Sequence, residues 1–127
     1  FYFPVFDLPW DDGLFAAALM CQIVSERDVV EELEDYPDYP VSPELRIDCP
    51  EHAKHKVTEA MKEEYSDHKT STMDGVKIQF DTGWVLVRPS STEEKMSVRC
   101  EADTEEDVDR ILDEVEGKVR EFIEHFS

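Results

Sequence analysis

The sequence predicts an α+β fold: a mainly antiparallel four-stranded sheet with two helices packed on one face, preceded by a helical remnant of an α/β domain. From residue 45 onward the hydrophobic patterns follow the order strand, helix, three strands, helix. Both helical patterns carry one apolar stripe, and two such stripes are most simply buried against a single sheet face. A chain of 127 residues can bury one compact core of this kind.

The first 36 residues contain an apolar helix that has little cover. Asp11 or Asp12 can cap a helix that continues through the segment LFAAALMCQIV, which is apolar on nearly every face. Such a helix needs neighbours on several sides, and this short chain supplies few. We therefore expect residues 1–36 to be the C-terminal helical remnant of a preceding domain, and a start at Phe1 rather than at methionine agrees with a fragment.

A second short helix and a proline-rich segment follow. Ser25 and Asp28 have the spacing of a capping box, which predicts an acidic helix over residues 27–34. Its inward-facing side chains would be Val29, Val30 and Leu33. Prolines recur through residues 36–43 and predict an extended segment, so we place the domain boundary there and assign residues 37–127 to the second domain.

The second domain begins with a strand and a helix. Apolar and polar residues alternate over 45–47, and Pro50 suits the first position of a helix. The expected inward face of this helix consists of Ala53, Val57, Ala60, Met61 and Tyr65. His52 and His55 lie one turn apart, but a metal site would need further ligands, so a solvated helix face is the preferred interpretation.

Three more strands come next. Alternation predicts strands over residues 76–80 and 95–101. Between them, residues 81–83 predict a three-residue hairpin loop with its glycine in the left-handed conformation. The apolar run over 84–87 predicts an interior strand with both faces covered or nearly so.

The last element is a long amphipathic helix. Thr104 and Asp107 resemble a capping box, and acidic residues in the first turn favour the positive end of the helix dipole. The apolar stripe of the helix comprises Val108, Ile111, Leu112, Val115, Val119, Phe122, Ile123 and Phe126.

The net charge of −19 is the most unusual bulk property. It excludes nucleic acid as an expected partner, because the phosphates would be repelled. A DNA mimic could be this acidic, but it would not need the polar loop described below. We favour a highly solvated surface, with adaptation to a salt-rich cytoplasm left open.

The cysteines and the hydropathy indicate a cytoplasmic protein with no membrane partner. Cys21, Cys49 and Cys100 are odd in number and lack close pairs, so we expect buried, reduced thiols rather than a disulfide or metal site. No segment approaches the roughly 20 apolar residues of a membrane span, and the first residues lack the pattern of a signal peptide.

One polar loop between two apolar strands is well suited to a phosphate group. Arg88 offers a planar fork of donors at a strand end, and Pro89 stiffens the start of the loop. Ser90, Ser91 and Thr92 add hydroxyls, and a tight turn would direct backbone N–H groups into the same concavity. By itself this sequence is also typical of a solvated hairpin.

Several segments in order along the chain resemble one known family. They are DGVKI (74–78), GWVLVRPSSTE (83–93) and EA (101–102), with DDGLFAA (11–17) and YPVSPELRI (39–47) upstream. Together they resemble the C-terminal domain of the α-phosphohexomutases, which include phosphomannomutase/phosphoglucomutase and phosphoglucosamine mutase. The resemblance covers nearly the whole chain and implies a TATA-binding-protein-like fold for its second part.

The resemblance implies a division of labour among four domains. A phosphoserine in the first domain exchanges a phosphoryl group with a hexose phosphate, and aspartates of the second hold Mg²⁺. The third domain binds the sugar hydroxyls, and the fourth binds the phosphate that is not reacting. The expected partners are therefore a hexose phosphate and the remaining domains of the enzyme, and this chain alone should be inactive. Which hexose is preferred is not encoded here.

The family's phosphate loop corresponds to Arg88, Ser90, Ser91 and Thr92, which the resemblance implies as substrate phosphate ligands. Arg88 would bind the phosphate as a fork, and Ser90 and Thr92 would donate through hydroxyl and backbone groups. None of these residues would be catalytic, and neither the catalytic serine nor the metal aspartates lie in this chain.

Three positions depart from the family pattern. The family usually has glycine or asparagine at Ser91, proline at Glu94 and often a second phosphate-binding arginine at Ser97. Arg99 lies two residues further along the same strand and therefore on the same face, so we expect it to supply the missing charge. An ion pair between Arg99 and a surface carboxylate is the alternative.

Two alternative functions are considered in addition to that of a mutase domain. A free-standing, non-catalytic phosphate-binding or interaction module could retain the same fold, and the departures in the loop keep this alternative open. A metal-dependent hydrolase would need clustered ligands, which the sequence lacks.

Overall fold

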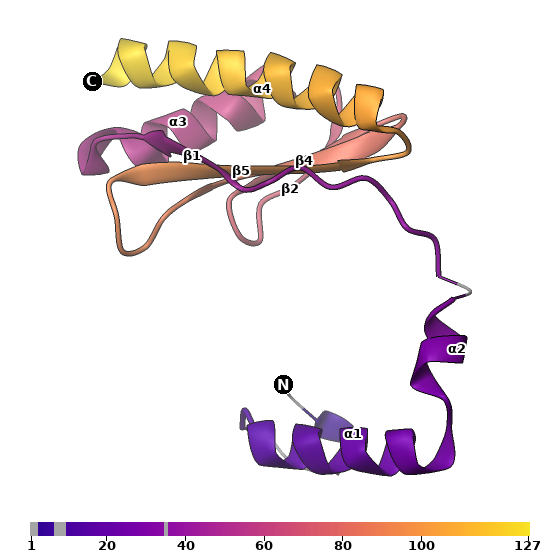
Figure 1. Ribbon diagram of the computed structural model, residues 1–127. Coiled ribbons are helices and arrows are strands. Elements are labelled where there is room, and N and C mark those ends of the chain that lie inside the picture. Colours follow the sequence, from indigo (N-terminus) through magenta and orange to yellow (C-terminus); the bar gives the residue numbers. More distant parts are fainter. Residues whose placement is uncertain (1–2, 7–9, 35) are drawn as a thin grey trace. The chain divides into compact units, whose positions relative to one another are not determined.

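The computed structural model describes residues 3–6, 10–34 and 36–127. The chain divides into two compact units, Phe1–Asp38 and Tyr39–Ser127 (Figure 1). The division falls within the proline-rich segment. Each unit is described by itself.

The first unit contains a 3₁₀ turn, η1 (Pro4–Phe6), and an apolar helix, α1 (Gly13–Glu26). Asp12 caps α1, because its carboxylate accepts a hydrogen bond of 2.8 Å from the Phe15 amide. The helix and the cap therefore follow the prediction. The ring of Phe15 contacts those of Phe3 and Phe6, but none of the residues of α1 is buried, so much of its apolar surface is left uncovered by the described residues of the unit.

The second helix of this unit, α2 (Val29–Leu33), differs from the prediction in its cap and orientation. Asp28 caps it, whereas the Ser25 hydroxyl donates to a carbonyl within α1, so the predicted capping box is wrong. Val30 and Leu33 are exposed rather than inward, because no described segment of the unit covers them, whereas Val29 is half-buried.

The second unit is built on one antiparallel sheet of five strands, not four. Its strands are β1 (Leu45–Asp48), β2 (Lys69–Ser71), β3 (Val76–Phe80), β4 (Gly83–Pro89) and β5 (Lys95–Ala102). Their order across the sheet is β1-β5-β4-β3-β2, and every neighbouring pair is antiparallel. The sequence pattern misses β2 because this short edge strand has no apolar alternation.

Helices α3 (Glu51–Glu64) and α4 (Glu105–Phe126) lie on the same face of this sheet (Figure 1). Thr104 caps α4 as predicted, accepting from the Asp107 amide. The core between helices and sheet includes Ile47, Val57, Met61, Val76, Ile78, Val85, Val87, Met96, Val98, Ile111, Val115 and Val119. The α+β fold with two helices on one sheet face is therefore confirmed.

The hairpin between β3 and β4 is tighter than predicted. Phe80 pairs with Gly83, so the loop consists of Asp81 and Thr82 alone, and Gly83 belongs to the strand. The prediction of a left-handed glycine there is wrong. Gly83 is instead required by close packing, because a Cβ would lie 2.4 Å from the Glu101 carbonyl oxygen.

Strand β4 has an interior position between β3 and β5, but only one of its faces is fully covered. Val85 and Val87 are buried against the helices, whereas Trp84 and Leu86 on the opposite face are half-buried. The expectation that both faces are covered or nearly so therefore holds for the helix-covered face, and the opposite face is covered only in part. The open face is available for a binding site.

The three cysteines differ in exposure, and we expect them to differ in reactivity. Cys49 and Cys100 are buried as predicted, but Cys21 is exposed, so the prediction is wrong for Cys21. Burial raises the pKa of the Cys49 thiol and raises that of Cys100 to about 11, which reduces their thiolate fractions. In native buffer a thiol reagent should label Cys21 rapidly and the other two only after addition of urea. Equal labelling rates would contradict the described burial.

Among the described residues, no helix combines the length and the apolar character needed to span a membrane.

Candidate functional site

Three neighbouring strands bring two arginines to the open face of the sheet. Arg46 on β1 pairs in register with Ser97 on β5, and Ser97 pairs with Arg88 on β4. Directly paired residues project from the same face, and this face is opposite to the one that buries Val87 and Val98. The two guanidinium groups therefore flank Ser97 in one row.

A cavity of about 260 Å³ lies at this row and beneath the loop between β4 and β5. Its lining residues are Glu44, Arg46, Asp74, Arg88, Pro89, Ser90, Ser91, Thr92, Lys95 and Ser97. The structure thus brings together the predicted Arg88, Ser90, Ser91 and Thr92. It adds Arg46 and Lys95, so three cationic side chains face two carboxylates.

The loop is folded around the Ser90 side chain. The Ser90 hydroxyl oxygen accepts from the amides of Thr92 at 3.4 Å and Glu93 at 3.2 Å, and the Ser90 amide donates to the Lys95 carbonyl. Because the hydroxyl accepts here, its own hydrogen stays available for a ligand. The Ser91 amide donates no hydrogen bond to any described residue. Both groups can therefore donate to an anion.

The cationic side chains rest against carboxylates at the edge of the cavity. Arg88 pairs with Asp74 at 3.1 Å, while Glu93 contacts both Arg46 and Lys95. The side chains of Arg88 and Arg46 are 47% and 46% exposed, and exposed pairs of this kind contribute little stability. A phosphate can therefore displace these carboxylates at low cost.

Glu44 places a permanent negative charge in the cavity wall. The Ser97 hydroxyl donates to Glu44 at 2.5 Å. This hydrogen bond, helped by the charges of Arg46 and Arg88 and opposed by desolvation, holds the pKa of Glu44 below its usual range. Glu44 is therefore ionised at neutral pH and lowers the net positive charge of the site.

Arg99, which was expected to supply the missing charge, lies outside the lining of the cavity. Arg99 lies on the same face of β5 but pairs with Leu86, is exposed and does not line the cavity. It makes no ion pair with the described residues, and its charge acts on Glu44 from a distance. Arg46 occupies the place beside Ser97 instead. In the sequence, Arg46 is visible only as an arginine within an apolar strand, and its pairing with Ser97 cannot be read from the sequence.

Glu94 connects the loop to the start of α3. Its carbonyl accepts from the Cys49 amide at 2.9 Å, and its carboxylate accepts from the Glu51 amide at 3.3 Å. A carboxylate is favourable at a helix N-terminus. The extra negative charge at this position is therefore directed at the helix and not at the cavity.

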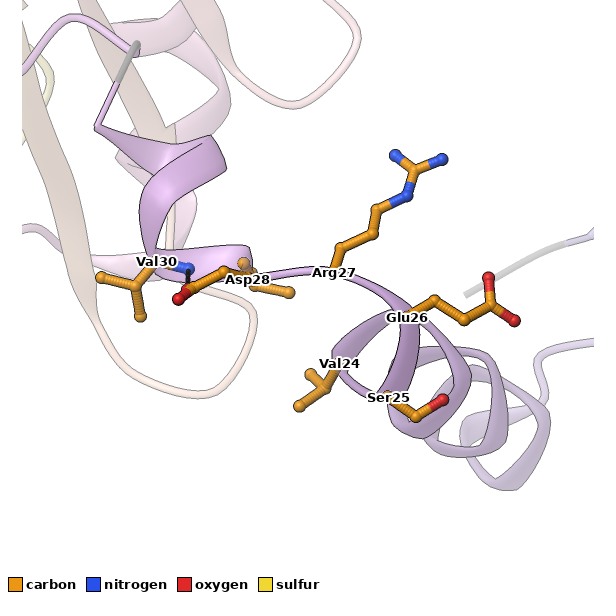
Figure 2. A pocket seen from close by; sticks show the side chains of 7 residues that line it. Val24, Ser25, Glu26, Arg27, Asp28 and Val30 are labelled. Carbon is orange, nitrogen blue, oxygen red and sulfur yellow. Dashed lines mark hydrogen bonds between the residues drawn. The ribbon is translucent and has the colours of Figure 1, made fainter.

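A larger hollow, of about 580 Å³, lies in the first unit where α1 meets α2. Seven consecutive residues, 24–30, line it (Figure 2). The side chains of Glu26 and Arg27 point away from Asp28, whose carboxylate accepts from the Val30 amide (Figure 2). Because these groups diverge, they do not form a site for a charged ligand.

No three His, Cys, Asp or Glu side chains of the described residues lie close enough together to hold a metal ion. His52 and His55 are both exposed on α3. The Mg²⁺ implied by the family resemblance therefore finds no ligand set among these residues.

The family model for the C-terminal domain of phosphoglucomutase/phosphomannomutase matches residues 44–118. This range contains β1, α3, all the cavity residues and most of α4.

Relatives extend the similarity over most of the chain. A probable phosphoglucosamine mutase of Pyrococcus horikoshii is 35% identical over 91% of this chain, and that of Methanopyrus kandleri is 38% identical over 89%. The phosphomannomutase/phosphoglucomutase of Pseudomonas aeruginosa is 35% identical over 80%. The chain covers only 27%, 26% and 23% of these three relatives. It therefore spans about a quarter of their length.

A solved structure shows the same fold. The phosphoglucomutase/phosphomannomutase family protein of Burkholderia thailandensis matches with a TM-score of 0.72 and 23% identity. The match covers 90% of this chain and 24% of that protein.

Proposed function

The chain belongs to the phosphoglucomutase/phosphomannomutase family through the C-terminal domain of that family, and we propose that this domain binds the non-reacting phosphate of a hexose phosphate during phosphoryl transfer. Arg88, Ser90, Ser91 and Thr92 are the proposed ligands, with Arg46 added by the structure. Arg99 acts at longer range.

The observation that carries the proposal is the convergence of these groups on one cavity. Arg46, Arg88 and Lys95 come from three strand positions, and the loop between β4 and β5 adds its hydroxyls. Planar guanidinium groups match phosphate oxygens with paired hydrogen bonds. In a chain of net charge −19, three cations in one cavity favour an anionic ligand there.

The site can assist phosphoryl transfer without touching the reacting atoms. Arg88 and Arg46 would hold the distal phosphate, while the Ser90 hydroxyl and the Ser91 amide would fix its orientation. Binding energy from such a remote group positions the reacting end of the substrate. A Mg²⁺ ion, where the whole enzyme holds one, would neutralise the phosphate that reacts.

The proposal also covers the rest of the protein. Residues 1–36 would be the end of the third domain, and residues 37–127 the fourth. The exposed apolar surface of α1 supports this assignment, as does the share of each relative that the chain spans. The 127-residue chain would be inactive by itself, and a cytoplasmic location, where its three free thiols would stay reduced, is part of the proposal.

The test is a two-dimensional NMR titration of the 127-residue chain with inorganic phosphate, glucose 1-phosphate and mannose 1-phosphate. We expect saturable shifts confined to residues 88–97 and to Arg46. Arg88→Ala should weaken binding at least about tenfold, because a charge-assisted hydrogen bond contributes about 1.5–3 kcal/mol. Arg46→Ala should weaken it less.

Arg120→Ala is the matched control, because it removes the same charge from a guanidinium paired with Glu116 on α4. It should leave phosphate affinity unchanged. Equal effects of the Arg88 and Arg120 variants would indicate a general charge effect and contradict the site. Absence of any localised shift at millimolar ligand would favour the non-catalytic module.

A further inference from the structure

A buried lysine lies directly behind the phosphate loop. Lys54, in the first turn of α3, is 4% exposed. Its ammonium donates to the carbonyls of Ser90 at 2.8 Å and Glu93 at 2.6 Å, and to the Glu51 carboxylate at 2.5 Å. All three ammonium hydrogens are therefore used, and two of them bind the loop.

These bonds determine which way the loop peptides face. The C=O and N–H of a trans peptide point in opposite directions, and none of the described peptide bonds is cis. Because the Ser90 carbonyl points to Lys54, the N–H of Ser91 in the same peptide must point away from it. This N–H is the one that donates to no described residue, and Ser91 lines the cavity.

We propose that Lys54 is the positioning residue of the phosphate loop, which aims the Ser91 N–H at the bound phosphate by holding the Ser90 and Glu93 carbonyls from behind. The proposal rests on the proposed function of the loop. Lys54 does not line the cavity and so acts through the loop, not as a direct ligand.

Two features favour this role over a purely structural one. A buried charge is costly unless every donor is satisfied, and an apolar side chain would fill the same space more cheaply. The partners of Lys54 also span the turn that contains Ser91 and Thr92, so their loss would release that turn.

The experiment compares inorganic phosphate binding to the 127-residue chain and to Lys54→Met, Lys54→Arg, Arg88→Ala and Lys118→Met. Binding is followed at the Ser91 amide, and folding at the amides of the buried Val76 and Ile78. Lys118→Met is the control, since it removes the same charge from a lysine paired with Glu64 on the helices.

Lys54→Met should keep the amide pattern of the core, bind inorganic phosphate at least tenfold more weakly and lose the phosphate-induced shift of the Ser91 amide. The phosphate affinity of Lys118→Met should stay within twofold of that of the unmodified chain. Lys54→Arg keeps the charge but cannot reproduce the three hydrogen bonds, so it should also bind phosphate more weakly. If Lys54→Met does not fold, Lys54→Arg is the variant that tests the proposal. If the folded Lys54 variants bind phosphate with unchanged affinity while Arg88→Ala binds it more weakly, the role of Lys54 is overturned but the proposed function is not. No phosphate shift in the unmodified chain overturns the proposed function and this inference with it.

Discussion

Replacing Gly75 with alanine is expected to destabilise the second unit by more than about 4 kcal/mol, which is exceptional for a single substitution. Gly75 has a φ of +83°, a conformation that L side chains rarely adopt. A Cβ there would lie 2.3 Å from the Val87 carbonyl oxygen and 2.6 Å from the Arg88 Cβ. The backbone strain and the two contacts add together, because no flexible side chain can move to relieve them.

The measurement is urea unfolding followed by tryptophan fluorescence in a Trp10→Phe background, so that Trp84 in the sheet is the sole reporter. Gly117→Ala is the control, because a Cβ at this exposed position of α4 meets nothing within 4 Å. It should stabilise the chain by up to about 1 kcal/mol through helix propensity. Similar midpoints for the two variants would contradict the described backbone at Gly75.

Gly75 also connects the fold to the site. Its absent side chain lets the turn before β3 approach the backbone of Arg88, and the preceding residue, Asp74, is the resting partner of the Arg88 guanidinium. The sequence contains this glycine in the segment DGVKI (74–78), one of those that carry the family resemblance. It does not show which glycine adopts the left-handed conformation, and turn chemistry wrongly predicted Gly83.

Sequence patterns predicted the helix caps and strand faces, because these depend on residues close together in the chain. Asp12 and Thr104 cap their helices because a short polar side chain satisfies free amides within three residues. The alternation over β3 and β5 marks the face that meets the helices. These features need no knowledge of distant segments.

Neighbours that come from distant segments cannot be read from local patterns. Arg46 and Ser97 are far apart in sequence, and only the antiparallel register of β1 and β5 makes them neighbours. Without that register, Arg99 was the nearest cation along the same strand. Lys54 was likewise hidden among charged residues of an amphipathic helix, since its burial depends on a loop that begins 36 positions later.

Ile111→Ala is expected to cost about 2–5 kcal/mol of unfolding free energy, because it deletes a fully buried side chain and leaves a cavity. The neighbouring Leu112 is only half-buried, so Leu112→Ala removes the same number of atoms and should cost less. Both variants are measured by the same urea unfolding with Trp84 as reporter. Equal losses would mean that α4 does not present Ile111 to the core as described.

Ile111→Ala also distinguishes the hydrophobic core from the phosphate site. Ile111 belongs to the core on the helix-covered face of the sheet, whereas Arg46, Ser97 and Arg88 lie in register on the open face. Phosphate affinity per folded molecule should therefore be unchanged in Ile111→Ala, although the fraction of folded molecules falls in urea. A parallel loss of affinity in the absence of urea would show that the row of Arg46, Ser97 and Arg88 responds to packing beneath the sheet. The phosphate site would then depend on the core as a whole and not on the loop and its strand ends.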